Sequence, residues 1–329
     1  MRLATLLCLV ALPAAADPFV DRVVDTVALP RFDAFASAAG ALAEAAQDDC
    51  SATGPALRQA WNDAFDAFLP AQAFRSGPME DRGIGIAYWP DPKGFTEKNL
   101  IALLAANGPD LVSAETYSGV SVAARGLYAL EVMLFDPAFK TYDPEDPGCA
   151  LVGAATADLA LTARAASAAW ALDYAPLLRS AGEPANTRFL TTQEVRQSLF
   201  TQLLTQLEFD KDERLGRPLG SLEKPRPTRA ESRASGRSLR NIRVSLAANE
   251  DLARALGADQ TEGVLPAFAY ARSVADKLTD PTLADVGTPG GRFRVQELAD
   301  AIGRVAETSS AELGAVLGVA PGFNALDGD

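Results

Sequence analysis

The segment F-V-D-R-V-V-D-T-V-A-L-P-R-F-D-A-F-A-S-A-A-G-A-L-A-E-A-A, residues 19–46, decides the fold class of this 329-residue chain. Its apolar residues, such as Val20, Val23 and Val27, recur every three or four positions, which is the spacing of one face of an α-helix. Pro30 is expected to kink or break that helix. The chain is rich in alanine and only 7% aromatic, a composition that favours helix over sheet.

The same periodicity continues through the chain, and no segment rich in valine and isoleucine alternates as a strand would. We therefore predict an all-α fold built as two helical bundles. The polar segment 180–191 is the expected boundary, between domains of residues 17–182 and 183–329. We expect further helices over residues 55–69, 96–106, 111–135, 153–179 and 191–209, three more up to residue 317, and loops at 75–93, 137–148 and 215–227.

The first sixteen residues are typical of a signal peptide. Arg2 gives a positive start, residues 3–12 are apolar, and Ala14, Ala15 and Ala16 form a small-residue cleavage site. The sequence therefore predicts an exported protein cleaved near Ala16. The apolar run is too short to cross a bilayer and no later stretch approaches about 20 apolar residues, so we expect no transmembrane segment.

Two cysteines, Cys50 and Cys149, remain after that cleavage. An even pair in an oxidising compartment predicts one disulfide. Two free buried thiols are the alternative.

The charge composition excludes several classes of function. The chain has 43 acidic residues, 30 basic residues and no histidine, so it cannot use a Ser-His-Asp or Cys-His relay, or hold zinc or haem iron through imidazole. A net charge of −13 argues against nucleic acid and anionic membranes as partners, although solubility alone would also explain it.

The segment S-V-A-A-R-G-L-Y-A-L-E-V-M-L-F, residues 121–135, holds the first candidate site. Glu131 lies among apolar residues, where a carboxylate must find a hydrogen-bond donor or take up a proton. On one helix Tyr128 would be its neighbour, with Ser121 two turns below Tyr128 and Arg125 nearby. A structural hydrogen bond between two helices is the plainer interpretation.

A second candidate segment is K-P-R-P-T-R-A-E-S-R-A-S-G-R-S-L-R-N-I-R, residues 224–243. The pattern predicts a helix capped near Thr228, with Glu231 and Ser235 facing the core and Ser232 at its border. Its arginines would then form one stripe, suited either to pairing with the acidic remainder of the chain or to binding an anion. The stripe would contain Arg229, Arg233, Arg237, Arg240 and Arg243.

In this order, behind a signal peptide, these segments resemble the imelysin family. G-L-Y-A-L-E, residues 126–131, is similar to the family's G-x-H-x-x-E signature, and E-S-R-A-S, residues 231–235, is similar to a second motif. Trp61, A-F-R-S-G-P from Ala73 and G-F-N-A-L-D-G-D from Gly322 add landmarks over nearly the whole chain. The resemblance implies a periplasmic or outer-surface, two-bundle helical protein associated with iron acquisition.

The resemblance also implies a polar site formed by Tyr128, Glu131, Glu231, Ser232 and Ser235, but Tyr128 stands where the signature has histidine. A helical zinc peptidase needs two imidazoles and a carboxylate for its metal, so zinc is not expected. Tyrosine and glutamate oxygens suit ferric iron, which makes iron, or a small anion, the expected ligand.

We therefore expect a periplasmic binding or accessory protein without peptidase activity, acting with iron-uptake partners. The alternatives are a peptidase with an unconventional centre and a partner-docking protein that uses the arginine stripe.

Overall fold

The computed structural model describes residues 17–108, 111 and 113–320, and every regular element in these ranges is a helix. The only β feature among them is an isolated antiparallel bridge between Ala87 and Gly126. The predicted all-α class is therefore confirmed. The predicted signal peptide and the landmark that begins at Gly322 lie outside the described residues.

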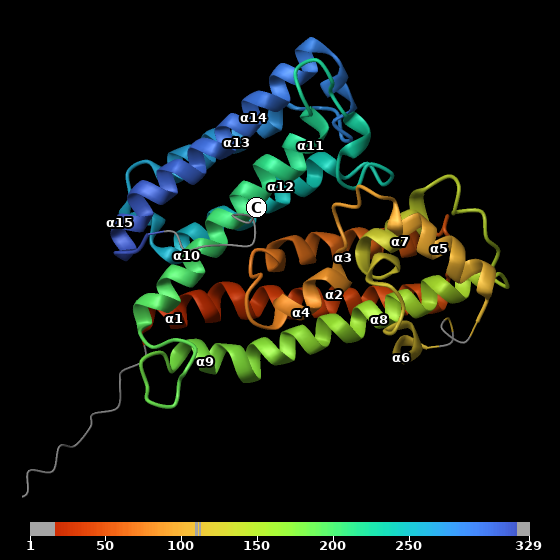
Figure 1. The fold of residues 1–329 in the computed structure, drawn as a ribbon, viewed down its shortest axis with the longest axis horizontal. Helices are drawn as coiled ribbons and strands as arrows, with labels where there is room; N and C mark the ends of the chain where they lie inside the picture. Colours follow the sequence, from red (N-terminus) through yellow and green to blue (C-terminus); the bar gives the residue numbers. More distant parts are fainter. Residues whose placement is uncertain (1–16, 109–110, 112, 321–329) are drawn as a thin grey trace, which may run out of the picture.

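The N-terminal half is organised around α2, which packs against α3 and α8 (Figure 1). Its helices are α1 (Pro18–Val23), α2 (Leu29–Asp48), α3 (Pro55–Gln72), α4 (Pro78–Ile86), α5 (Phe95–Ala106), α6 (Ala114–Tyr117), α7 (Gly126–Phe135), α8 (Pro147–Ala169) and α9 (Ala175–Arg179).

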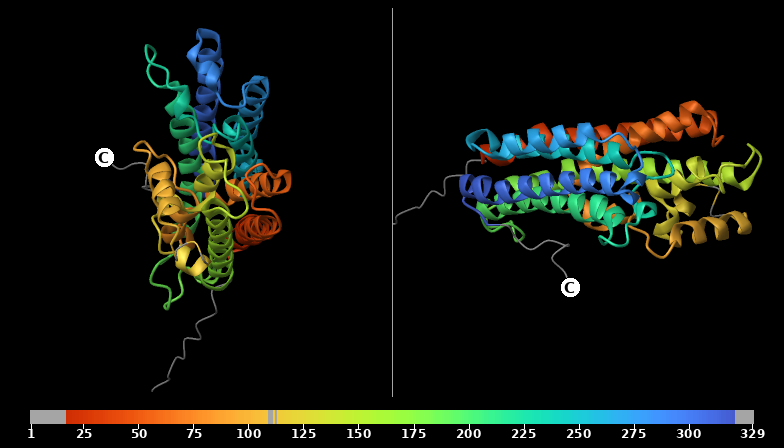
Figure 2. Two further views of the ribbon diagram at one scale, coloured as in Figure 1. Left: turned by 90° about the vertical axis from the view of Figure 1, so that its right-hand side faces the viewer. Right: turned by 90° about the horizontal axis from the view of Figure 1, so that it is seen from above.

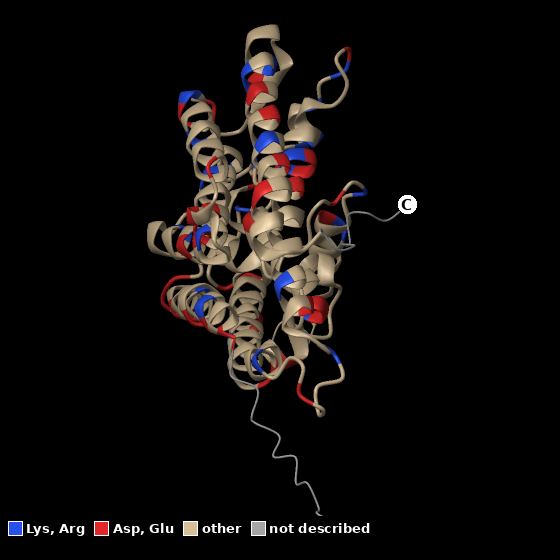
Figure 3. Cartoon of the chain, turned by 90° about the vertical axis from the view of Figure 1, so that its left-hand side faces the viewer, with Lys and Arg blue, Asp and Glu red and all other residues tan. Residues whose placement is uncertain are grey.

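The C-terminal half packs α13 against α14, and α10 against both α12 and α14. Its helices are α10 (Thr192–Glu208), α11 (Gly216–Leu219), α12 (Ser238–Leu256), α13 (Val264–Lys277), α14 (Pro289–Thr308) and α15 (Gly314–Leu317). Helix α12 also contacts α1 and α3, so buried residues of both halves form one hydrophobic core. The helices α12, α13 and α14 are inclined to α2 and α8 in Figure 1, although they overlie them in similar directions when seen from above (Figure 2). Charged residues of both signs are spread along the helices (Figure 3).

Several boundaries differ from the sequence prediction because proline has more than one role in helices. Pro30 follows a π-helical turn, Val24–Ala28, which joins α1 to α2 without a break. Pro147 occupies the first turn of α8, where its missing N–H costs nothing, so this helix begins six residues earlier than predicted. Pro70 lies within the last turn of α3 instead of ending it.

One predicted loop contains a helix, and one predicted helix contains a loop. The expected loop at 75–93 contains α4, and the helix expected over 111–135 is interrupted between α6 and α7. Gly126 ends that interruption in a left-handed conformation, φ +72°, which a continuous α-helix cannot contain.

The continuous helix from Pro147 to Arg179 is long and apolar enough to cross a membrane, with a mean hydropathy of 1.3 over an 18-residue stretch. Such a helix can equally form the core of a helical bundle. Here α8 packs against α2, α4, α6 and α7.

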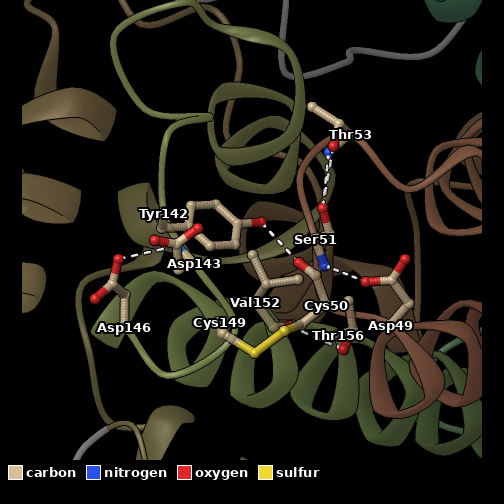
Figure 4. The surroundings of a disulfide bond; sticks show 10 residues. All are labelled: Asp49, Cys50, Ser51, Thr53, Tyr142, Asp143, Asp146, Cys149, Val152 and Thr156. Atoms are coloured by element: carbon tan, nitrogen blue, oxygen red, sulfur yellow. Dashed lines mark hydrogen bonds between the residues drawn. A yellow bond between two sulfur atoms is a disulfide. The ribbon is translucent and has the colours of Figure 1, made fainter.

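The predicted disulfide between Cys50 and Cys149 is present and joins the loop after α2 to the first turn of α8 (Figure 4). Their Cα atoms are 5.3 Å apart. The disulfide joins residues that are 99 positions apart in the sequence and so closes the N-terminal half. Beside it, the Tyr142 hydroxyl donates to the Cys50 carbonyl at 3.0 Å.

Candidate functional site

The signature helix α7 is positioned by close backbone contact at its first residue. A Cβ atom on Gly126 would lie 2.1 Å from the Ile86 carbonyl oxygen, so only glycine lets the two backbones approach this closely. The Trp61 indole N–H donates to the Leu127 carbonyl at 3.0 Å. These contacts fix the start of α7 and direct Tyr128 and Glu131 inward, where both side chains are buried.

Tyr128 meets Glu231, which is 1% exposed and comes from the second motif. The Tyr128 hydroxyl donates to Glu231 Oε1. Glu231 Oε2 accepts from Arg214 Nε at 2.8 Å and from Asn241 Nδ2 at 2.9 Å. Burial and the Glu231 charge raise the pKa of the Tyr128 phenol well above its ordinary value, so Tyr128 is a neutral donor.

Arg214 lies between two buried carboxylates. Its Nη1 donates to Asp210 Oδ1 at 2.5 Å and its Nη2 donates to Gln72 Oε1 at 2.7 Å. Burial opposes its charge, but Glu231 and Asp210 outweigh burial and raise its pKa. Asp210 and Arg214 share one π-helical turn, Phe209–Leu215, and Ser245 on α12 donates to Asp210 Oδ2 at 2.7 Å.

Glu131 accepts two hydrogen bonds at Oε1, from the Ser235 backbone N–H at 3.0 Å and from the Ser235 hydroxyl at 2.7 Å. Burial raises the pKa of Glu131 to about 7, although the bonds from Ser235 act in the opposite direction. Ser235 also donates to the Ser232 carbonyl at 3.1 Å, and Ser232 has φ +48°. A tight turn therefore carries the second motif over the signature helix.

The structure thus brings together five of the predicted site residues, Tyr128, Glu131, Glu231, Ser232 and Ser235. Tyr128 and Glu131 do not bond to each other: Tyr128 donates to Glu231, and Glu131 accepts from Ser235.

The other two predicted residues lie apart because the helix does not extend before Gly126. Arg125 forms a two-bond ion pair with Asp158 of α8, at 2.8 and 2.9 Å, and Ser121 is exposed in the preceding segment. Sequence reasoning missed Asp210, Arg214 and their polar partners. The spacing of Asp210 and Arg214, four residues apart in a helical segment, was the available signal.

The predicted arginine stripe is wrong. Residues 230–237 form turns after a short 3₁₀ segment, and α12 begins only at Ser238. Arg237 is 2% exposed and donates to Asn62 Oδ1 at 2.7 Å and to Asp66, whereas Arg229 and Arg233 are exposed. The helix fails because Glu231, Ser232 and Ser235 make their bonds from a turn with two left-handed residues, Ser232 and Gly236.

The donor set does not fit a zinc ion. Zinc peptidase sites require imidazole, and the sequence contains no histidine. Within the described ranges, no three Asp, Glu or Cys residues are grouped as a metal site would need. The guanidinium of Arg214 lies between Asp210 and Glu231 and supplies the positive charge that these carboxylates require.

The family model described as Imelysin (Peptidase_M75) matches residues 28–308. The chain belongs to the imelysin family.

Two solved structures show the same fold. An imelysin-like protein from Psychrobacter arcticum 273-4 is 22% identical, with a TM-score of 0.74 over 94% of this chain and 100% of that one. A candidate iron-regulated protein A precursor from Parabacteroides distasonis ATCC 8503 is 14% identical, with a TM-score of 0.72 over 91% of this chain and 93% of that one. No curated protein matches the sequence.

Proposed function

We propose that this imelysin-family protein is a periplasmic binding or accessory component linked to iron uptake and that it lacks peptidase activity. Family membership and a structural neighbour named for iron regulation support the link to iron. The predicted signal peptide supports the location.

The loss of peptidase activity rests on one observation, the position of Arg214. A metallopeptidase must bind an ion that activates water, and buried carboxylates of this site would have to hold it. Asp210 and Glu231 instead hold the guanidinium of Arg214, at 2.5 and 2.8 Å. Tyr128, at the signature position for histidine, donates to Glu231 and has a raised pKa, so it is poorly suited to ligate zinc.

A protease assay tests this part of the proposal. Purified protein is incubated with casein and with insulin chains, with added zinc and with or without chelator. We expect no chelator-sensitive cleavage. Tyr128→His, which restores the signature residue, should also remain inactive because the chain offers no second imidazole. Robust cleavage by the wild type would establish the enzyme alternative.

Coordination of iron by Tyr128 and Glu131 stays a prediction. Calorimetric titration of ferric and ferrous iron into wild type and Glu131→Ala tests it. Weaker binding by the variant would support a role for Glu131, and identical isotherms would remove it. Pull-down of periplasmic proteins with the tagged chain tests the iron-uptake partner separately.

A further inference from the structure

A groove of about 530 Å³ lies where the two halves meet, on the side of α2 and α3 that faces α12. Its walls come from the segment joining α1 to α2, from α3 and from α12. Three arginines, Arg22, Arg31 and Arg254, line it against a single acidic residue, Asp251. Arg254 has ion-pair partners of its own, so the local excess of positive charge comes from Arg22 and Arg31, in a chain with a net charge of −13.

Arg31 lines the groove and forms no ion pair with a carboxylate of the described residues. Its Nη1 donates to the Pro70 carbonyl at 3.2 Å and its Nη2 donates to the Ala248 carbonyl at 2.5 Å. Burial lowers the pKa of Arg31 to about 10, and the charge of Asp251 only partly opposes this. Carbonyl oxygens satisfy N–H groups but leave the charge uncompensated, so the site would gain from an added anion.

Arg22 contributes a second cation that forms no ion pair with the described residues. Its Nε donates to the Ala255 carbonyl of α12 at 2.8 Å, and within the described part of the chain its two terminal nitrogens stay open to a ligand. Arg254, on the α12 wall, is already paired with Glu250 and Asp259, at 2.8 and 3.1 Å. Arg22 and Arg31 are therefore the cations available to bind.

The π-helical turn Val24–Ala28 is what places Arg22 and Arg31 on the same groove. In a regular α-helix, nine residues turn the chain by about 900°, which would put the two side chains on opposite faces. One inserted residue in a π-turn reduces the separation to about 80°. The Leu29 N–H bond to the Val24 carbonyl, five residues back, marks this insertion.

We propose that this groove binds a small amphipathic organic anion, with its acid group between Arg22 and Arg31 and its apolar body on the groove wall. Guanidinium groups suit carboxylates because their N–H groups match the two oxygens. The wall beside them is apolar, formed by Val27, Pro30 and Ala67 among others. The groove volume falls within the common range for small-molecule sites, about 300–1,000 Å³. This site is separate from the Tyr128–Glu231–Arg214 network.

Octanoate is the probe, titrated calorimetrically into the purified protein, with octanol as the neutral match and sodium sulfate as a bare anion. We expect the wild type to bind one octanoate per chain and to bind octanol at least about tenfold more weakly. Arg22→Gln and Arg31→Gln should each bind octanoate at least about tenfold more weakly than the wild type, which corresponds to the loss of one charged contact. Arg229→Gln is the matched control, since Arg229 is exposed and lies outside the groove; it should bind like the wild type.

Arg31 also joins α3 to α12 through its carbonyl contacts, so its variant could fail for structural reasons. Ala34→Phe avoids this difficulty, because Ala34 is exposed on the groove wall and a phenyl ring there fills space without removing a bond. It should abolish octanoate binding and leave the circular dichroism spectrum unchanged. The proposal would be overturned if the wild type did not bind octanoate, or if it bound octanol or sulfate as tightly as octanoate. Unchanged octanoate binding by Ala34→Phe would overturn it as well.

Discussion

At the scale of single residues, Tyr128 retains a polar role at a position where the family signature has histidine. Its hydroxyl reaches across to the other half of the molecule and donates to Glu231, and its ring packs edge-on against Phe65 at 5.4 Å. The tyrosine is therefore one end of a buried chain of hydrogen bonds that continues through Arg214 to Asp210.

Tyr128→Phe should destabilise the protein by about 1–3 kcal/mol, because Glu231 Oε1 loses its donor while remaining buried. The phenyl ring keeps its packing, so the loss reports the hydroxyl alone. Urea unfolding followed by circular dichroism measures it. Tyr270→Phe is the control: the Tyr270 hydroxyl makes an exposed 3.3 Å bond to Glu297, and its removal should cost less than about 0.5 kcal/mol. Equal losses for the two variants would contradict the expectation.

Glu131 should make stability fall as the pH rises. Its pKa is about 7 in the folded protein, against an ordinary value of 4.5. Below about pH 4.5 the Glu131 carboxyl is protonated in both the folded and the unfolded protein. Between about pH 4.5 and 7 it ionises in the unfolded chain but stays protonated in the folded protein, which stabilises the unfolded chain relative to the folded one. Above pH 7 the loss of folding stability due to Glu131 reaches its full value, about 3 kcal/mol, and no longer changes with pH.

The difference in unfolding free energy between Glu131→Gln and wild type isolates this effect from other titrating groups. The glutamine oxygen can still accept both bonds from Ser235, so the variant should gain relative stability as the pH rises from 4.5 to 7. Urea titrations at half-unit pH steps would show it. A difference that does not change with pH would rule out a raised pKa at Glu131.

How much of the site the sequence could predict depends on where each residue's partners lie. Glu131 stood out because a carboxylate in an apolar helix needs a donor, and the structure supplies Ser235. Arg214 did not stand out, because its charge in a run of charged residues resembles a solvated surface. Its burial follows from the packing of the π-helical turn Phe209–Leu215 against α12, which periodicity does not reveal.

At the scale of elements, a sequence pattern suited to a helix competes with side-chain hydrogen bonds that need a different backbone conformation. The 224–243 segment has suitable spacing for a helix, yet its first part turns so that Ser235 can present both its N–H and its hydroxyl to Glu131. The Ser238 hydroxyl then donates to the Glu231 carbonyl at 2.5 Å. Only from Ser238 onward does the pattern form a helix, α12, and its apolar residues Leu239, Ile242 and Leu246 are buried.

Among the glycines next to the site, Gly126 at the start of α7 should tolerate substitution least. Gly126→Ala would force a side chain into a left-handed residue and against the Ile86 carbonyl, so we expect a loss of more than about 2 kcal/mol. Gly153→Ala is the opposite control: it lies in α8 with nothing within 4 Å of the added Cβ and should stabilise by about 0.5–1 kcal/mol. Thermal unfolding of both variants measures the contrast, and a neutral Gly126→Ala would show that the loop at Ile86 can move.

At the scale of the whole molecule, the fold class followed from residue periodicity alone, whereas the arrangement of the helices did not. The apolar stripes predict which face of each helix is buried but not which partner buries it. The disulfide is the exception, because composition and the expected compartment predicted a contact between residues 99 positions apart.

Removing that disulfide should lower the free energy of unfolding by up to about 4 kcal/mol, since a closure of this length restricts the unfolded chain strongly. Cys50→Ala with Cys149→Ala is compared with wild type by thermal unfolding, each with and without dithiothreitol. Reductant should lower the wild-type melting temperature to that of the double variant and leave the variant unchanged. A wild type insensitive to reductant would mean that the bond contributes no stability.

The two halves should unfold together, even though the polar segment 180–191 divides the sequence between them. Glu131 and Tyr128 have their hydrogen-bond partners in the C-terminal half, and Arg237 has its carboxylate partner, Asp66, in the N-terminal half. Opening the interface would leave several buried polar groups without partners, each costing about 1–3 kcal/mol. Differential scanning calorimetry should therefore give one transition, with equal calorimetric and van't Hoff enthalpies. Two resolved transitions in the disulfide-bonded protein would show instead that each bundle is stable alone.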